Sequence, residues 1–144
     1  MTDSRAMNDK KILLIEDSPD LSFLYKKSLS TFGVAIEHAN SGRSALSLLQ
    51  TLKPSLIIMD LTLGDMSVED FYSQFSSVEA TQEVPLILIS GREDVLSWAD
   101  LFGASFVAKK PVDMVRFRKA VQELLQFDDD TSAEVKRPAS PTLI

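Results

Sequence analysis

The chain contains no cysteine, which excludes disulfide bonds, thiolate catalysis and zinc sites built on cysteine. It also lacks an apolar run approaching the roughly 20 residues that cross a bilayer. The first ten residues are polar and do not contain the apolar stretch of a signal peptide. From these absences we expect a cytoplasmic protein with no membrane partner.

Basic residues are in the minority, with 15 lysines and arginines against 21 aspartates and glutamates and a net charge of −6. This balance argues against nucleic acid as a partner, because non-specific binding needs basic residues facing the phosphates. The hydrophobic share of 44% and the charged share of 25% are those of an ordinary globular protein. The length of 144 residues suits one domain with a single core.

Five short apolar runs alternate with segments of helical periodicity. The runs are of strand length and rich in Ile, Leu and Val, which is typical of strands buried on both faces of a parallel sheet. They cover residues 11–15, 34–38, 55–59, 84–89 and 105–108. Helices are expected over residues 20–32, 41–52, 67–77, 93–102 and 113–127. This order predicts an α/β fold, a doubly wound sheet with right-handed crossovers.

The two ends of the chain differ in composition from this segment. Residues 1–9 are expected to form a flexible N-terminus and residues 10–127 the folded domain. The last segment, 128–144, begins with three aspartates and contains Pro138 and Pro141. It is expected to be a disordered tail or linker, since it is too short for a second domain.

Polar and charged residues follow four of the five apolar runs. Glu16 and Asp17 follow the first run, Asp60 the third, Ser90 the fourth, and Lys109 and Lys110 the fifth. In an open parallel sheet, ligands bind beyond the carboxyl ends of the strands. We therefore expect these side chains to meet at one edge of the sheet.

The chemistry of these side chains is complementary. Three carboxylates in one crevice repel each other unless protons or a cation intervene, and Mg²⁺ suits such a site because it binds carboxylates together with water and phosphoryl oxygens. A lysine can pair with a carboxylate and then with a phosphate, and Ser90 adds a hydroxyl group. A carboxylate can also act as a nucleophile that forms an aspartyl-phosphate. Asp60, at the end of the central strand, has the position for that role.

The chain resembles the CheY-like receiver domains of two-component response regulators over about residues 10–127. The similarity rests on four segments in the family's order: LLIEDSPD with an acidic pair, LIIMDLTLGDM with an acceptor aspartate, LILISG with a hydroxyl, and AKKP with a lysine before proline. The resemblance implies a flavodoxin-like (βα)5 fold with a five-stranded parallel sheet in the order 2-1-3-4-5. It also implies a signalling domain that is not an enzyme beyond self-phosphotransfer and autodephosphorylation.

The resemblance further implies a role for each residue of the site. Asp60 would take the phosphoryl group from a histidine kinase or a histidine phosphotransfer protein, and Ser90 and Lys110 would contact the phosphoryl oxygens. The residues implied for Mg²⁺, or Mn²⁺ in its place, are Glu16, Asp17, Asp60 and, through its backbone carbonyl, Thr62. The peptide bond between Lys110 and Pro111 would be cis.

The sequence also departs from the family's pattern. Gly64 stands where the family usually has proline, and Val68 where a glycine usually closes the loop after the acceptor. On the fifth strand Val107 occupies the position of the family's switch aromatic, with Phe106 one residue earlier. These departures motivate a second interpretation, a receiver-fold interaction module that is not switched by phosphorylation.

The favoured hypothesis is a stand-alone receiver that signals by contact with an unknown protein target, a second copy of itself included as a homodimer. A third hypothesis, a haloacid-dehalogenase-like phosphatase, is disfavoured because Thr62 stands where that family has a second aspartate. The only histidine, His38, is expected to be structural or exposed. Trp98 is expected to pack within the domain, with contact to a partner as the alternative.

Overall fold

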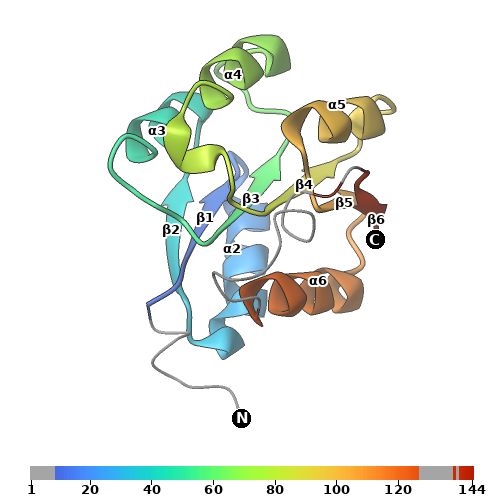
Figure 1. The fold of residues 1–144 in the computed structure, drawn as a ribbon. Coiled ribbons are helices and arrows are strands. Elements are labelled where there is room, and N and C mark those ends of the chain that lie inside the picture. The colour runs from blue at the N-terminus through green and yellow to red at the C-terminus, as the bar shows by residue number, and fades with distance from the viewer. Residues whose placement is uncertain (1–8, 127–137, 139) are drawn as a thin grey trace.

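The computed structural model describes residues 9–126, 138 and 140–144 (Figure 1). Within this part of the chain, parallel strands form one sheet in the order β2-β1-β3-β4-β5-β6. The strands are β1 (Lys11–Ile15), β2 (Ala35–Ala39), β3 (Leu56–Asp60), β4 (Leu86–Ser90), β5 (Phe106–Lys109) and β6 (Thr142–Leu143). The predicted order 2-1-3-4-5 of the first five strands is confirmed.

Helices connect the strands in the alternation that the sequence predicts. They are α2 (Pro19–Leu29), η1 (Ser30–Phe32), α3 (Gly42–Leu48), α4 (Val68–Phe75), η2 (Glu79–Thr81), α5 (Val95–Phe102) and α6 (Met114–Gln126). Most are shorter than predicted by a few residues, and α3 ends at Leu48 instead of residue 52. None of the helices in the described part of the chain is long and apolar enough to cross a bilayer.

The helices cover the sheet in two layers, with α3, α4 and α5 on one face and α2 and α6 on the other (Figure 1). Alternate residues of each strand supply the two cores, because successive side chains of a strand point to opposite faces. Leu13 and Ile57 belong to the first core, and Ile12 and Ile58 to the second. Strands β3 and β4 are buried throughout, as their continuous apolar sequences predict.

Local sequence signals fix where the helices begin and end. Ser18, Ser41 and Ser67 precede α2, α3 and α4, and each accepts a hydrogen bond from the backbone N–H three residues later. Gly33 and Gly103 have left-handed backbones with φ of 68° and 70°, which glycine adopts without steric cost. These two residues turn the chain from a helix toward β2 and β5.

The C-terminal end of the chain differs from the prediction of a disordered tail over residues 128–144. Thr142–Leu143 forms β6 on the outer edge of β5, so the sheet has six strands where five are predicted. The outer edge of β5 offers backbone groups for pairing, and Thr, Leu and Ile suit an extended conformation. Residues 127–137 and 139, and residues 1–8 of the predicted N-terminal segment, lie outside the described residues.

Candidate functional site

The carboxyl ends of β1, β3, β4 and β5 meet at one edge of the sheet and carry the predicted site. Glu16 follows β1, Asp60 and Ser90 are the last residues of β3 and β4, and Lys110 follows β5. Parallel pairing keeps these ends level, since Ser90 pairs with Lys109 across β4 and β5. The side chains therefore converge although they are far apart in sequence.

Asp60 is buried, with 3% of its surface exposed, and both of its carboxylate oxygens have partners. Oδ1 accepts a hydrogen bond of 2.9 Å from the backbone N–H of Thr62. Oδ2 lies 2.5 Å from the Nζ of Lys110. The backbone N–H of Lys110 donates to the carbonyl of Ser90 at 3.0 Å, and its peptide bond to Pro111 is cis, as predicted. A lysine charge is thus held against a buried carboxylate.

Glu16 is buried beside Asp60 and lacks a comparable set of partners. Its Oε1 accepts a hydrogen bond of 3.1 Å from the N–H of Ser18, whereas its buried Oε2 has no partner among the described residues. Burial is the main cause, and the neighbouring Asp60 carboxyl the next, that raises the pKa of Glu16 to about 8. The N–H of Ser18 and the charge of Lys110 act in the opposite direction. Burial and Asp60 therefore favour the protonated form of Glu16 at pH values where an ordinary glutamate is ionised.

The carboxyl groups of Glu16 and Asp60 fit a hard divalent cation. The buried Oε2, which has no partner among the described residues, could serve as an oxygen ligand. The single charge of Lys110 does not balance the two carboxyl groups when both are ionised. Groups of three or more His, Cys, Asp or Glu side chains that could hold a metal are absent from residues 9–126, 138 and 140–144. A cation here would need backbone oxygens and water besides the carboxylates, which is a ligand set that Mg²⁺ takes.

Asp17 differs from its neighbour Glu16 in its surroundings. It is exposed, and its Oδ2 accepts a hydrogen bond of 3.2 Å from the backbone N–H of Gly64. Gly64 stands where the family usually has proline, which has no N–H to donate. In this chain Asp17 therefore contacts the loop after Asp60.

Asp65 also belongs to the region of the site, although no motif or spacing in the sequence indicates it. Its Oδ1 and Oδ2 accept hydrogen bonds of 2.8 and 3.0 Å from the N–H groups of Gly42 and Arg43, at the start of α3. Burial acts to raise the pKa of Asp65, but these hydrogen bonds outweigh it and lower the pKa below its ordinary value. A Cβ atom on Gly42 would lie 2.6 Å from the Sδ of Met66. Asp65 and Met66 thus join the loop after Asp60 to α3 through contacts that local sequence patterns do not reveal.

His38 also lies closer to the site than its sequence position suggests. Its Nε2 donates a hydrogen bond of 2.9 Å to the backbone carbonyl of Glu16. The N–H of Glu16 in turn donates to the carbonyl of Ala39 at 3.0 Å. Of the two expectations for His38, structural or exposed, the hydrogen bond supports the structural one, because His38 holds the backbone of a site residue.

Ser90 and the two candidate switch residues occupy distinct surroundings. Ser90 is buried, and its Oγ accepts a hydrogen bond of 3.0 Å from the N–H of Arg92, so its hydroxyl hydrogen can be donated elsewhere. Val107 is buried in the core beneath α3, α4 and α5. Phe106 is half-buried and packs against the opposite core, beneath α2 and α6. On β5 the side chain of Phe106 therefore faces the layer of α2 and α6, whereas Val107 faces the layer of α3, α4 and α5.

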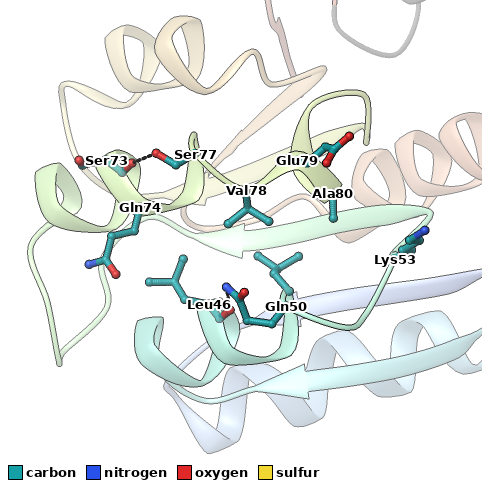
Figure 2. A pocket seen from close by; sticks show the side chains of 10 residues that line it. Leu46, Gln50, Lys53, Ser73, Gln74, Ser77, Val78, Glu79 and Ala80 are labelled. Carbon is teal, nitrogen blue, oxygen red and sulfur yellow. Dashed lines mark hydrogen bonds between the residues drawn. The ribbon is translucent and has the colours of Figure 1, made fainter.

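A hollow of about 850 Å³ lies apart from this site, between α3 and the region of α4 and η2 (Figure 2). Leu46 on one side and Val78 on the other point into it (Figure 2). Its lining consists of Leu46, Leu49, Gln50, Lys53, Ser73, Gln74, Ser77, Val78, Glu79 and Ala80. No lining residue belongs to the candidate site, so the chemistry at the sheet edge is separate from this hollow.

The sequence matches the family model described as the response regulator receiver domain over residues 12–122. Among solved structures, the signal receiver domain of a protein described as a LuxO repressor from Vibrio parahaemolyticus is 32% identical. It has a TM-score of 0.69, with 81% of this chain and 90% of that chain covered. The chemotaxis response regulator CheY4 of Vibrio cholerae is 21% identical, with a TM-score of 0.71 over 80% and 98% of the two chains. At 21% identity, the similarity to CheY4 supports the fold alone.

Curated proteins give the same likeness. "Probable transcriptional regulator ycf27" of Porphyridium aerugineum is 26% identical over 137 residues, which is 93% of this chain and 55% of that protein. Protein PilH of Pseudomonas aeruginosa is 23% identical, with 80% of this chain and 97% of PilH covered. The chain spans only 8% of histidine kinase P4 of Formosa agariphila. Several relatives are thus far longer than the part that this chain matches.

Proposed function

This chain belongs to the response regulator receiver domain family, and on that premise we propose that Asp60 is its phosphoacceptor. Acceptance of a phosphoryl group is the general function of the family. The observation that carries the proposal is the setting of Asp60, a buried carboxylate at the end of β3 with its Oδ2 2.5 Å from the Nζ of Lys110. Such a setting fixes the nucleophile and places a positive charge where phosphoryl oxygens would arrive.

The proposed step is a transfer from a phosphohistidine to the carboxylate. An oxygen of Asp60 forms a bond to phosphorus while the bond from phosphorus to the donor nitrogen breaks, and the electron pair of that bond leaves with the imidazole. Lys110 would pair with a phosphoryl oxygen, and Ser90 would donate its hydroxyl hydrogen to another. Water later attacks the phosphorus, the bond from phosphorus to the Asp60 oxygen breaks, and inorganic phosphate leaves while the Asp60 carboxylate is regenerated.

Mg²⁺, or Mn²⁺ in its place, would supply positive charge to the phosphoryl oxygens when bound. The residues proposed to hold it are Glu16, Asp17, Asp60 and the backbone carbonyl of Thr62. Glu16 supports this assignment because its buried Oε2 has no partner in the described part of the chain. Asp17 would have to exchange its hydrogen bond from Gly64 for the cation or for a water bound to it.

The donor and the target follow from the same proposal. The donor would be a histidine kinase or a histidine phosphotransfer protein. The phosphorylated chain would act as a stand-alone module that binds a protein target or a second copy of itself. A cytoplasmic location is part of this proposal.

The test is phosphorylation by acetyl phosphate and Mg²⁺, followed by intact-mass spectrometry. The wild type should gain the mass of one phosphoryl group, and the adduct should be labile. Asp60→Asn should gain none, whereas Asp20→Asn, which changes an exposed aspartate on α2, should behave as the wild type. An adduct that persists in Asp60→Asn would overturn the assignment.

The receiver-fold module without a phosphorylation switch stays the alternative, favoured by Val107 in the place of an aromatic residue. Amide NMR spectra with and without beryllofluoride and Mg²⁺ separate the two functions. Shifts at Ser90 that extend along α5 and α6 would support the switch. The absence of both a labile adduct and any shift at Ser90 would favour the module.

A further inference from the structure

The outer edge of β5 carries a short strand from the far end of the chain. Thr142 donates its backbone N–H to the carbonyl of Ser105 at 3.0 Å, and Ile144 donates to the carbonyl of Val107 at 2.8 Å. In register, Thr142 pairs with Phe106 and Leu143 with Val107. Figure 1 shows β6 beside β5 at the edge of the sheet. This edge is thus able to accept an extended segment in parallel orientation.

Among the described residues, β6 makes few contacts with the rest of the domain. Strand β6 has two residues, and the side chain of Leu143 is exposed over 52% of its surface. Thr142 is exposed as well. Ile144 is partly buried and packs against the core beneath α2 and α6, as Phe106 does. A segment held by so few contacts can be replaced by another strand that makes the same backbone hydrogen bonds.

We propose that the β5 edge is a docking site for an extended segment of a partner protein and that residues 142–144 are its intramolecular competitor. The partner segment would run parallel to β5 and donate N–H groups to the carbonyls of Ser105 and Val107. It would carry an apolar side chain at the position of Ile144, next to Phe106. The proposal does not depend on phosphorylation of Asp60.

The position of this edge connects it to the rest of the domain. Strand β5 ends at Lys109, which pairs with Ser90 and is followed directly by Lys110. A strand docked at Ser105–Val107 therefore lies on the same element that delivers Lys110 to Asp60. An unpaired edge strand can pair with the same edge of another copy of the chain. Strand β6 would prevent this by occupying the edge of β5.

Two proline variants of the full chain test the competitor. Proline removes the backbone N–H, so Thr142→Pro deletes the hydrogen bond to Ser105. Leu143→Pro is the matched control, because the N–H groups of successive strand residues point to opposite edges of the strand. Thr142 and Ile144 donate to β5, so the N–H of Leu143 points away from β5. The readout is exchange of the amide hydrogen of Val107. The N–H and C=O of one strand residue point to the same edge, and the carbonyl of Val107 accepts from Ile144 on the β6 side. Exchange should be about tenfold faster in Thr142→Pro than in the wild type and Leu143→Pro.

Docking itself is measured with a fluorescent peptide of residues 138–144 as the probe. Thr142→Pro should bind it about tenfold more tightly than the wild type does, because its own segment no longer competes. Equal exchange at Val107 in the two proline variants would overturn the proposal, as would failure of Thr142→Pro to bind the peptide. Protection of Val107 that rises with wild-type concentration would also overturn it, since the strand would then come from a second copy.

Discussion

Glu16→Gln is the substitution whose consequence follows most directly from the site. Gln has nearly the shape of Glu but stays neutral at every pH. In the wild type, burial and the neighbouring Asp60 raise the pKa of Glu16 from an ordinary 4.5 to about 8. Without a divalent cation, the folded wild type must therefore either keep Glu16 protonated or tolerate a buried charge, whereas the variant avoids both.

The sign of the effect follows from linkage between proton binding and folding. A carboxyl group with a raised pKa in the folded state stabilises folding fully below its unfolded pKa, and that contribution is lost as pH rises through the folded pKa. For Glu16 the window runs from pH 4.5 to about 8. At about 1.4 kcal/mol per pH unit, the loss reaches about 3 kcal/mol at pH 7 and at most about 5 kcal/mol above pH 8.

Urea denaturation in EDTA at pH 5, 7 and 8.5 measures this difference. The free energy of unfolding of Glu16→Gln relative to wild type should increase with pH by several kcal/mol, whatever constant offset the amide introduces. Glu123→Gln, which changes an exposed glutamate on α6, controls for the loss of one charge and should run parallel to the wild type. Parallel profiles for wild type and Glu16→Gln would refute the reasoning, because Glu16 would then not be titrating in an abnormal range.

Two further predictions concern the contact between α3 and the loop after Asp60. Gly42→Ala should destabilise the wild type by about 1 kcal/mol through its clash with Met66. It should be neutral or stabilising in a Met66→Ala background, where the clash is absent and alanine favours the helix; urea denaturation of the four proteins gives the coupling. Asp65→Ala should cost about 1 kcal/mol, as the loss of a helix cap does. Thermal denaturation should show that cost shrinking as pH falls, since the lowered pKa of Asp65 stabilises the folded state above its unfolded pKa and not in acid.

The sequence predicts the sheet because each central strand is an uninterrupted apolar run. Leu56–Asp60 and Leu86–Ser90 are buried at every position, so neither face needs a polar residue and each run ends where the first functional group appears. The position of Asp60 and Ser90 at the sheet edge follows from that ending alone. Their proximity to Lys110 then follows from the parallel order of the strands.

Contacts made by loops and by the chain's end are not readable in the same way. Asp65 accepts hydrogen bonds from Gly42 and Arg43, and no spacing or periodicity links a loop residue to a helix start more than 20 positions earlier. Strand β6 has two residues, which are too few to form an apolar run that could be recognised in the sequence. Glu16 and Asp17 read as one acidic pair, yet their side chains diverge because successive residues at a strand end point in different directions.

The charges at the site connect the raised pKa of Glu16 with the proposed cation. Asp60 has the N–H of Thr62 and the ammonium of Lys110 as partners, whereas Glu16 has an oxygen with none in the described part of the chain. When both carboxyl groups are ionised, the ammonium of Lys110 leaves one negative charge unbalanced, which favours binding of a proton or of a cation. Mg²⁺ at 100 times its Kd should stabilise the wild type at pH 8 by about 3 kcal/mol in the same urea assay. It should stabilise Glu16→Gln distinctly less, and an equal gain in both proteins would remove Glu16 from the proposed ligands.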